Sequence, residues 1–306
     1  MKIMVFDVGG TEIKYSVMDE QMHRTNSGAV PTPQDTQAQF LDAVYRLYAP
    51  HKDEVSGIAM ALPGFVDNRT GYVSNGGALL YNTATPVGQL LAEKCGCPVI
   101  LENDGKAAAM AELANGALKD CCNAAVFIIG TGVGGGIIAN GQLVRGVHFT
   151  AGEYSFANTN AEAWDAPDQN MACQCSTSNL LKWYRARKAL PEDAPLDGRS
   201  FFAAANAGEP EALEVLRRFC HAVAVQIYNL TVLLDVEKVA IGGGISKQPL
   251  LLESLRSAYD GLYASRAGQA YMEGLPRCQI VPCAFSSEAN QVGVAAAYFE
   301  AMQKKC

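Results

Sequence analysis

The chain lacks the features that mark membrane, secreted and nucleic-acid-binding proteins. No apolar run approaches the roughly 20 residues of a membrane-spanning helix, and Asp7 interrupts the short apolar run after Lys2, so we expect no signal peptide. Lys and Arg do not cluster, and the net charge is −7, which argues against nucleic acid as a main partner. These absences favour a cytoplasmic protein with neither a membrane nor a nucleic-acid partner.

Histidine is also scarce, and cysteine follows no legible pairing scheme. The four His residues are scattered, and no nucleophilic triad can be read. Without a signal peptide, we expect the ten Cys residues to be reduced thiols, and only Cys173 and Cys175 stand in a plausible metal-binding setting. With 49% hydrophobic residues, the 306-residue chain is an ordinary globular protein, long enough for two domains with full cores.

A glycine-rich loop, residues 130–136, organises the middle of the chain. Gly130, Gly132 and Gly135 spell the G-x-G-x-x-G of dinucleotide-binding folds, but that fingerprint needs a helix directly after the glycines. Here an apolar pair is followed by Asn140-Gly141 and a second apolar segment, which predicts a β-hairpin. The loop therefore joins two strands, and it is either a phosphate-binding turn or a plain tight hairpin.

The first residues of the chain repeat this pattern. A strand ending near Asp7 leads through the turn Gly9-Gly10-Thr11 into a second strand that contains Lys14. Two such hairpins, each opening one half of the chain, indicate an internal duplication. Because glycine lets backbone N–H groups face a ligand, the two turns together are suited to clamp one polyphosphate.

Strands and helices alternate through the rest of the chain, which predicts an α/β fold. In the first half, Thr32 and Pro33 are expected to be the N-cap and first residue of a helix. In the second half, a strand at residues 236–241 leads through Gly242-Gly243-Gly244 into another helix. That glycine turn is either a seat for a flat nucleobase or only a tight turn.

The pair Asn103-Asp104 stands where a predicted strand gives way to a helix. One interpretation is helix capping, which Asn and Asp perform routinely. The other is a general base at the carboxyl end of a strand, where α/β folds bind ligands. In phosphoryl transfer such an Asp accepts the proton of the attacking hydroxyl, while backbone amides and Mg²⁺ neutralise the phosphate charge. Together with the two glycine hairpins, the pair favours a kinase.

Three further charged residues each have two interpretations. Asp7 either holds Mg²⁺ through water or stabilises a turn at a strand end. Lys14 either meets a phosphate or is an exposed strand lysine. Glu153 either hydrogen-bonds sugar hydroxyls or is a solvated loop carboxylate.

Taken together and in order, the motifs resemble those of the ROK family of repressors and sugar kinases over essentially the whole chain. The resemblance implies the actin-like, ribonuclease-H-type ATPase fold, with two lobes and a ligand cleft between them. It implies a first lobe of residues 1–118 plus 288–306, a second of residues 119–287, and a homodimer. The matching segments are Asp7 to Thr11 with Lys14, residues 61–64, Glu102-Asn103-Asp104, residues 129–136, Ala151-Gly152-Glu153 and residues 241–245.

The resemblance also implies roles for single residues. Asp104 is the expected base. ATP and its phosphates are expected at Asp7, Gly9, Gly10, Thr11, Lys14, Gly130, Thr131, Gly132, Gly134, Gly135, Gly242, Gly243 and Gly244, with Mg²⁺ at Asp7. The sugar is expected at Gly64, Gly77, Asn103, Asp104, Lys106 and Glu153.

Departures from the family pattern bear on the substrate. The Gly-His of family glucokinases is replaced by Ser155 and Phe156, and the zinc segment keeps Cys173 and Cys175 but has Lys182 in place of its sugar-binding Glu. Two thiolates cannot complete a closed tetrahedral site, so we predict no structural zinc. The changes look like the β-glucoside kinase branch, which phosphorylates the 6-hydroxyl of disaccharides such as cellobiose. Glucokinase and N-acetylmannosamine kinase are the alternatives.

Two other classes of function compete with a kinase. Family repressors carry a helix-turn-helix ahead of the core, whereas the first hairpin here begins at Lys2, and the chain is acidic. A catalytically silent sugar-binding protein on the same fold is the second rival. The presence of Asp104 and of both glycine hairpins favours activity.

Overall fold

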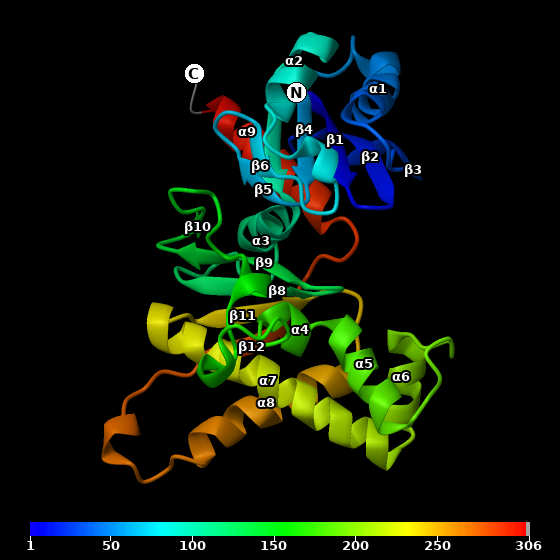
Figure 1. Ribbon diagram of the computed structural model, residues 1–306. Coiled ribbons are helices and arrows are strands. Elements are labelled where there is room, and N and C mark those ends of the chain that lie inside the picture. Colours follow the sequence, from blue (N-terminus) through cyan, green and yellow to red (C-terminus); the bar gives the residue numbers. More distant parts are fainter. Residues whose placement is uncertain (304–306) are drawn as a thin grey trace. The chain divides into compact units, whose positions relative to one another are not determined.

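Two five-stranded sheets with the same order of strands organise the chain (Figure 1). The first has the order β3-β2-β1-β4-β7, with β1 and β2 and then β2 and β3 antiparallel, and β1, β4 and β7 parallel. The second has the order β10-β9-β8-β11-β12, with β8 and β9 antiparallel and β8, β11 and β12 parallel. The repeated order agrees with the internal duplication predicted from the two glycine turns.

The computed structural model describes residues 1–303, and these form two units. The first consists of Met1–Gly116, Leu143–Ala151 and the chain from Ser287 onward, and the second of Ala117–Gln142 and Gly152–Ser286. Residues 304–306 of the predicted first lobe lie outside the described residues. No helix within residues 1–303 is both long enough and apolar enough to cross a membrane.

The strands and helices have the following bounds. The strands are β1 Lys2–Val8, β2 Glu12–Asp19, β3 Arg24–Pro31, β4 Ile58–Leu62, β5 Phe65–Asp67, β6 Tyr72–Asn75, β7 Val99–Asn103, β8 Ala124–Ile129, β9 Val133–Ala139, β10 Gln142–Val144, β11 Lys238–Gly242 and β12 Gln279–Pro282. The α-helices are α1 Gln37–Tyr48, α2 Val87–Cys95, α3 Asp104–Asn115, α4 Met171–Cys175, α5 Thr177–Arg187, α6 Gly198–Asn206, α7 Pro210–Leu234, α8 Pro249–Ala264 and α9 Ala289–Gln303. Short 3₁₀ helices lie at Ala49–His51, Leu80–Asn82, Tyr154–Phe156, Ala161–Ala163 and Ala270–Met272.

In the first unit, helices cover both faces of the sheet. Met4, Phe6 and Val8 of β1 share one hydrophobic cluster with Phe40 and Val44 of α1. Because alternate residues of a strand point to opposite faces, Ile3 and Val5 of β1, which are also buried, face the other side, where α9 packs on β1, β4 and β7. Continuous apolar strands of this kind are typical of a sheet buried on both faces.

Helices α3 and α9 of this unit approach each other very closely. A Cβ on Gly293 of α9 would lie 1.7 Å from the carbonyl oxygen of Ala107 in α3, so a glycine is required at the crossing. The Ala-rich sequence of α3 serves the same purpose, because small side chains let two helix backbones come together. This packing fixes α3, whose first turn carries Asp104.

The second unit packs its long helix against the sheet. Phe127 of β8 lies in one core cluster with Leu216 and Phe219 of α7 and with Leu251 and Leu255 of α8. The buried residues of α7 recur at helical spacing and so form an apolar stripe along one side of the helix.

Local signals predicted some boundaries correctly and one wrongly. Asn140 and Gly141 have φ of 53° and 69° and join β9 to β10, as predicted for a hairpin. The helix expected to start at Thr32 starts at Gln37 instead, with Thr36 as its N-cap. The Thr32 hydroxyl donates to the carbonyl oxygen of Gly9 at 2.8 Å, so Thr32 holds the first glycine turn rather than a helix.

Candidate functional site

Asn103 and Asp104 form the junction between β7 and α3. Asn103 is the N-cap of α3, and its Oδ1 accepts a hydrogen bond from the Lys106 N–H at 3.0 Å. Its Nδ2 donates to the carbonyl oxygen of Gly64 at 2.9 Å and to Asp104 Oδ1 at 3.1 Å. Asp104 Oδ1 also accepts from the N–H of Gly105 at 2.7 Å. Asn103 therefore both caps helix α3 and positions the Asp104 carboxylate.

Two glycines stand directly beside this junction. Gly64 has a φ of +93°, and a Cβ there would lie 2.0 Å from the carbonyl oxygen of Asn75 and 2.7 Å from the nitrogen of Gly77. Gly77 has a φ of +56°, and its N–H donates to Asn75 Oδ1 at 2.8 Å. The structure thus brings together Gly64, Gly77, Asn103 and Asp104 from the predicted sugar set, and Lys106 lies buried in the first turn of α3.

A buried ion pair lies under the same junction, and sequence reasoning missed it. Glu102, with 0% of its side chain exposed, pairs with Arg145 at 2.8 Å between Oε2 and Nε. Its Oε1 accepts from the Asn103 N–H at 3.1 Å, and Asn68 Nδ2 donates to Oε2 at 3.4 Å. A charged residue at the end of an apolar strand signals a partner elsewhere, because an unpaired buried carboxylate is very costly, but nothing local identifies Arg145 as that partner.

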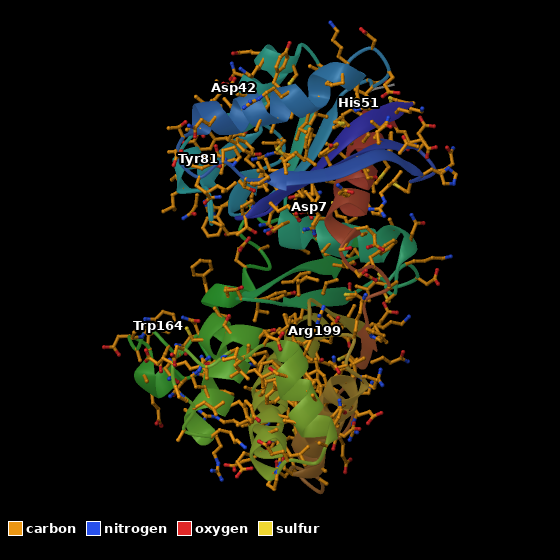
Figure 2. All side chains as sticks on the ribbon, turned by 90° about the vertical axis from the view of Figure 1, so that its right-hand side faces the viewer. Asp7, Asp42, His51, Tyr81, Trp164 and Arg199 are labelled. Atoms are coloured by element: carbon orange, nitrogen blue, oxygen red, sulfur yellow. The ribbon has the colours of Figure 1, made fainter. Side chains whose placement is uncertain are left out.

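Asp7 lies near the end of β1, two residues before the first glycine turn, and is half-buried; it is labelled in Figure 2. Burial raises the pKa of Asp7 above its ordinary value of 3.8, while a hydrogen bond from Asn290 and the charge of Lys14 oppose that rise. Lys14 stands directly across from Asp7 in the β1–β2 register, and Asn290 Nδ2 donates to Asp7 Oδ1 at 2.8 Å. Asn290 was missed, since 283 residues separate it from Asp7.

Polar side chains from one segment fix the glycines of this turn. The carbonyl oxygen of Gly9 accepts from the Thr32 hydroxyl, and that of Gly10 accepts from Gln34 Nε2 at 2.7 Å. The N–H of Thr32 donates to the carbonyl oxygen of Thr11 at 3.0 Å. The turn is therefore held in shape through its carbonyl groups.

The second glycine turn is held by Ser155. The Ser155 hydroxyl accepts from the N–H of Val133 at 3.0 Å and lies 3.1 Å from the same residue's carbonyl oxygen. Within the turn, the Gly130 N–H donates to the carbonyl oxygen of Gly132 at 3.0 Å. Backbone conformation and packing both require a glycine at 135, because its φ is +143° and a Cβ would lie 1.8 Å from the carbonyl oxygen of Val126.

The third glycine turn adjoins the second. A Cβ on Gly243, whose φ is +96°, would lie 2.1 Å from the carbonyl oxygen of Ile129, the residue that ends β8. Since β8 and β11 are parallel neighbours, both turns leave the same edge of the sheet. By contrast, a Cβ on Gly130 or Gly244 would meet no atom within 4 Å, so the backbone is open at those two points.

Glu153 follows the close contact between Gly152 and the second turn. Gly152 has a φ of +79°, and a Cβ there would lie 3.3 Å from the Cα of Gly136. Glu153 directly precedes the 3₁₀ helix Tyr154–Phe156, and Phe156 is exposed. The loop is thereby packed against the strand that follows the glycine turn.

The two cysteines of the zinc-like segment are not equivalent. Cys175 is buried, and burial raises the pKa of its thiol to about 12. The Sγ of Cys173 lies 3.7 Å from the carbonyl oxygen of Pro167. Across residues 1–303, no three His, Cys, Asp or Glu side chains gather closely enough to hold a metal ion.

Comparisons with known proteins place this geometry in a family. Residues 3–303 match the model of the ROK family. The β-glucoside kinase of Listeria innocua is 31% identical over 84% of this chain and 87% of its own length. The N-acetyl-D-glucosamine kinase of Vibrio atlanticus is 30% identical over 82% of this chain and 86% of its own.

Structural comparison gives the same result. The structure is similar to that of a ROK family glucokinase from Streptomyces griseus in complex with glucose and AMPPNP, with a TM-score of 0.79 and 25% identity over 97% of this chain and 99% of that one. The predicted α/β, actin-like ATPase fold is therefore confirmed. The chain belongs to the ROK family, and its close relatives show it to be one of the ATP-dependent carbohydrate kinases.

Proposed function

We propose that the protein transfers the γ-phosphoryl group of ATP to the 6-hydroxyl of a β-glucoside such as cellobiose, with Asp104 as general base. The observation that carries the proposal is the junction of β7 and α3. There Asn103 holds both Asp104 Oδ1 and the carbonyl of Gly64. A base must have a defined position relative to the hydroxyl it deprotonates, and this arrangement supplies one.

Electrostatics at the junction support the same role. Asp104 is the first residue of α3, where the helix dipole favours a negative charge. The helix N-terminus therefore stabilises the negative charge that a general base carries before it accepts the proton of a sugar hydroxyl. Glu102 lies behind Asn103 and is neutralised by Arg145, so it does not compete as an acceptor.

The glycine turns fit the phosphates of ATP. The open backbone at Gly130 and Gly244 leaves space for a ligand to approach, and backbone N–H groups in glycine turns are suited to bind anions. When bound, ATP supplies the phosphoryl group that is transferred. We assign the positions predicted from sequence in the three turns, with Thr131 and Lys14, to nucleotide binding.

Asp7 fits a magnesium-binding role. It is enclosed, its pKa is raised by burial, and a cation beside it would favour the ionised form. Because Mg²⁺ keeps much of its water, a single carboxylate is a sufficient anchor. Asn290 Nδ2 donates to the carboxylate, and Lys14 stands across from Asp7 in the β1–β2 register.

The choice of a β-glucoside rests on substitutions near the predicted sugar site. Ser155 ties down the glycine turn and Phe156 is exposed, so neither supplies the histidine of family glucokinases. Lys182 stands in place of a sugar-binding Glu. A β-glucoside kinase is also among the relatives that match most of the chain.

The test is mass-spectrometric detection of sugar phosphate after incubation with Mg-ATP and cellobiose, gentiobiose, glucose, N-acetylmannosamine or N-acetylglucosamine. Phosphorylation of a disaccharide with a higher kcat/KM than glucose supports the proposal. Equal or better use of glucose, or of one N-acetylated sugar, overturns the β-glucoside assignment and keeps the kinase. Binding of a sugar without any product points to a sugar-responsive regulator.

A further inference from the structure

Residues 32–37 of the first unit, which we call the bridge, hold the first glycine turn from one side. The Thr32 hydroxyl donates to the carbonyl oxygen of Gly9 at 2.8 Å, and Gln34 Nε2 donates to that of Gly10 at 2.7 Å. Because Gly9 and Gly10 lack side chains, the bridge holds the turn through its backbone carbonyl groups.

The bridge is also tied to residues 76–85, which we call the Gly77 loop. The hydroxyl of Tyr81, which is labelled in Figure 2, donates to the carbonyl oxygen of Pro33 at 2.8 Å. Gln37 Nε2 donates to Asn82 Oδ1 at 3.1 Å and to Thr85 Oγ1 at 2.8 Å. These hydrogen bonds join the bridge to one end of the Gly77 loop.

Tyr81 is well suited to make this contact. Its ring is partly buried against the core of the first unit, with its centre 6.1 Å from the centre of the Phe40 ring. Burial raises the pKa of its hydroxyl to about 12, so the group keeps its proton at neutral pH and acts as a donor. Because the proline ring restricts φ at Pro33, a bond to its carbonyl oxygen restrains a segment that is already stiff.

The other end of the Gly77 loop lies beside the junction of β7 and α3. The N–H of Leu79 donates to the carbonyl oxygen of Gly76 at 2.9 Å, and a Cβ on Gly76 would lie only 2.1 Å from the carbonyl oxygen of Leu79. A Cβ on Gly77 would lie 2.9 Å from the nitrogen of Gly64, the residue whose carbonyl oxygen accepts from Asn103. The loop is therefore packed against the junction.

The first glycine turn and the Gly77 loop also touch directly. A Cβ on Gly10 would lie 3.1 Å from the Cβ of Ala78, so the two segments come close at this point. Contacts thus run without a break from the glycine turn, through the bridge and Tyr81, to the Asn103-Asp104 junction. All of these residues belong to the first unit.

We propose that Tyr81 is a positioning residue, whose hydroxyl fixes the distance between the first glycine turn and Asp104. The inference rests on the proposed function, in which that turn binds a phosphate of ATP and Asp104 is the base. Phosphoryl transfer needs the attacking hydroxyl, the phosphorus and the leaving oxygen roughly in line, and a displacement of about 1 Å can cost about 10²-fold in rate. Tyr81 acts through Pro33 and the bridge, without touching either ligand.

Tyr81→Phe tests the proposal, because it removes the hydroxyl and keeps the ring in its core contacts. We expect kcat with Mg-ATP and the best sugar of the panel to fall about tenfold. KM for ATP and KM for the sugar should each change by less than about threefold, because each ligand keeps its own contacts.

The second unit offers a matched control. Tyr263 of α8 makes the same kind of contact, since its hydroxyl donates to the carbonyl oxygen of Pro276 at 2.8 Å. Tyr263→Phe should lower Tm at least as much as Tyr81→Phe does, but it should leave kcat unchanged. An unchanged kcat in Tyr81→Phe, or a loss that appears only in KM, would overturn the proposal.

Hydrogen exchange separates failure of this proposal from failure of the proposed function. The N–H groups of Gly9 and Thr32 are hydrogen-bonded, at 2.9 and 3.0 Å, within and beside the first glycine turn, and exchange measures how often such bonds open. In Tyr81→Phe we expect both amides to exchange at least about threefold faster, whereas Tyr263→Phe should leave them unchanged. Exchange that is equal in Tyr81→Phe and the unaltered protein would refute the role of Tyr81. Because exchange needs no turnover, it can be measured even if no sugar of the panel is phosphorylated, a result that would count against the proposed function instead.

Discussion

The ion pair between Glu102 and Arg145 yields a prediction with a definite magnitude. Arg145→Met removes the positive partner of the Glu102 carboxylate, which is 0% exposed and keeps its negative charge. Breaking a buried pair in this way typically costs about 3–5 kcal/mol. Arg145 is itself 28% exposed, and Asn68 and the Asn103 N–H remain as donors. We therefore expect the lower end, about 3 kcal/mol, or a Tm lower by roughly 6–12 °C.

A matched control exists in the second unit. Arg187 pairs with Glu214 through the same atoms at the same 2.8 Å, but with 50% and 53% of the two side chains exposed. Exposed pairs contribute about 0–1 kcal/mol, so Arg187→Met should change Tm by at most a few degrees. Calorimetry of both variants decides the matter: equal shifts would refute the burial argument. Because Glu102 also holds the Asn103 N–H, Arg145→Met should lower kcat in the surviving folded protein.

Three further predictions concern other sites. Burial raises the pKa of Asp7 above 3.8. Between pH 3.8 and that raised pKa the folded state binds more protons at this group than the unfolded state, so the contribution of Asp7 to stability falls as the pH rises. Asp7→Asn should therefore raise Tm at pH 7, and the gain in Tm should shrink towards pH 4. In Gly135→Ala the new Cβ would lie 1.8 Å from a carbonyl oxygen, so the free energy of unfolding measured in urea should fall by at least about 3 kcal/mol. In Gly244→Ala the new Cβ would meet no atom within 4 Å, so the free energy of unfolding should fall by less than about 1 kcal/mol. EDTA should leave Tm unchanged, because we predict no structural zinc, and release of zinc on unfolding would contradict that prediction. A thiol reagent should not modify Cys175, because the pKa of its thiol is about 12.

The features predictable from sequence were those with local causes. The glycine turns and the Asn140-Gly141 hairpin depend on conformational preferences of neighbouring residues, and the structure contains each of them. The Asn103-Asp104 junction was predicted for the same reason, since a capping residue between a strand and a helix acts within a few residues.

Features that depend on distant residues were not predictable. Arg145 is separated from its partner Glu102 by 43 residues, and Asn290 is separated from its partner Asp7 by 283 residues. No pattern near Arg145 or Asn290 identifies it as a partner. The misplaced start of α1 has a similar cause, because Thr32 and Thr36 are both residues that commonly cap a helix, and both stand shortly before α1. Only the hydrogen bond from Thr32 to Gly9 decides which threonine serves as the cap.

The most direct test of the central claim is the turnover of Asp104→Asn with Mg-ATP and the best sugar of the panel, measured beside the dissociation constant of that sugar. Amide replacement keeps the size of the side chain and its position after the Asn103 cap, so binding should change by only a few-fold. If Asp104 is the base, kcat should fall by about 10²–10⁴. A kcat within tenfold of the unaltered protein, with sugar binding intact, would contradict the account.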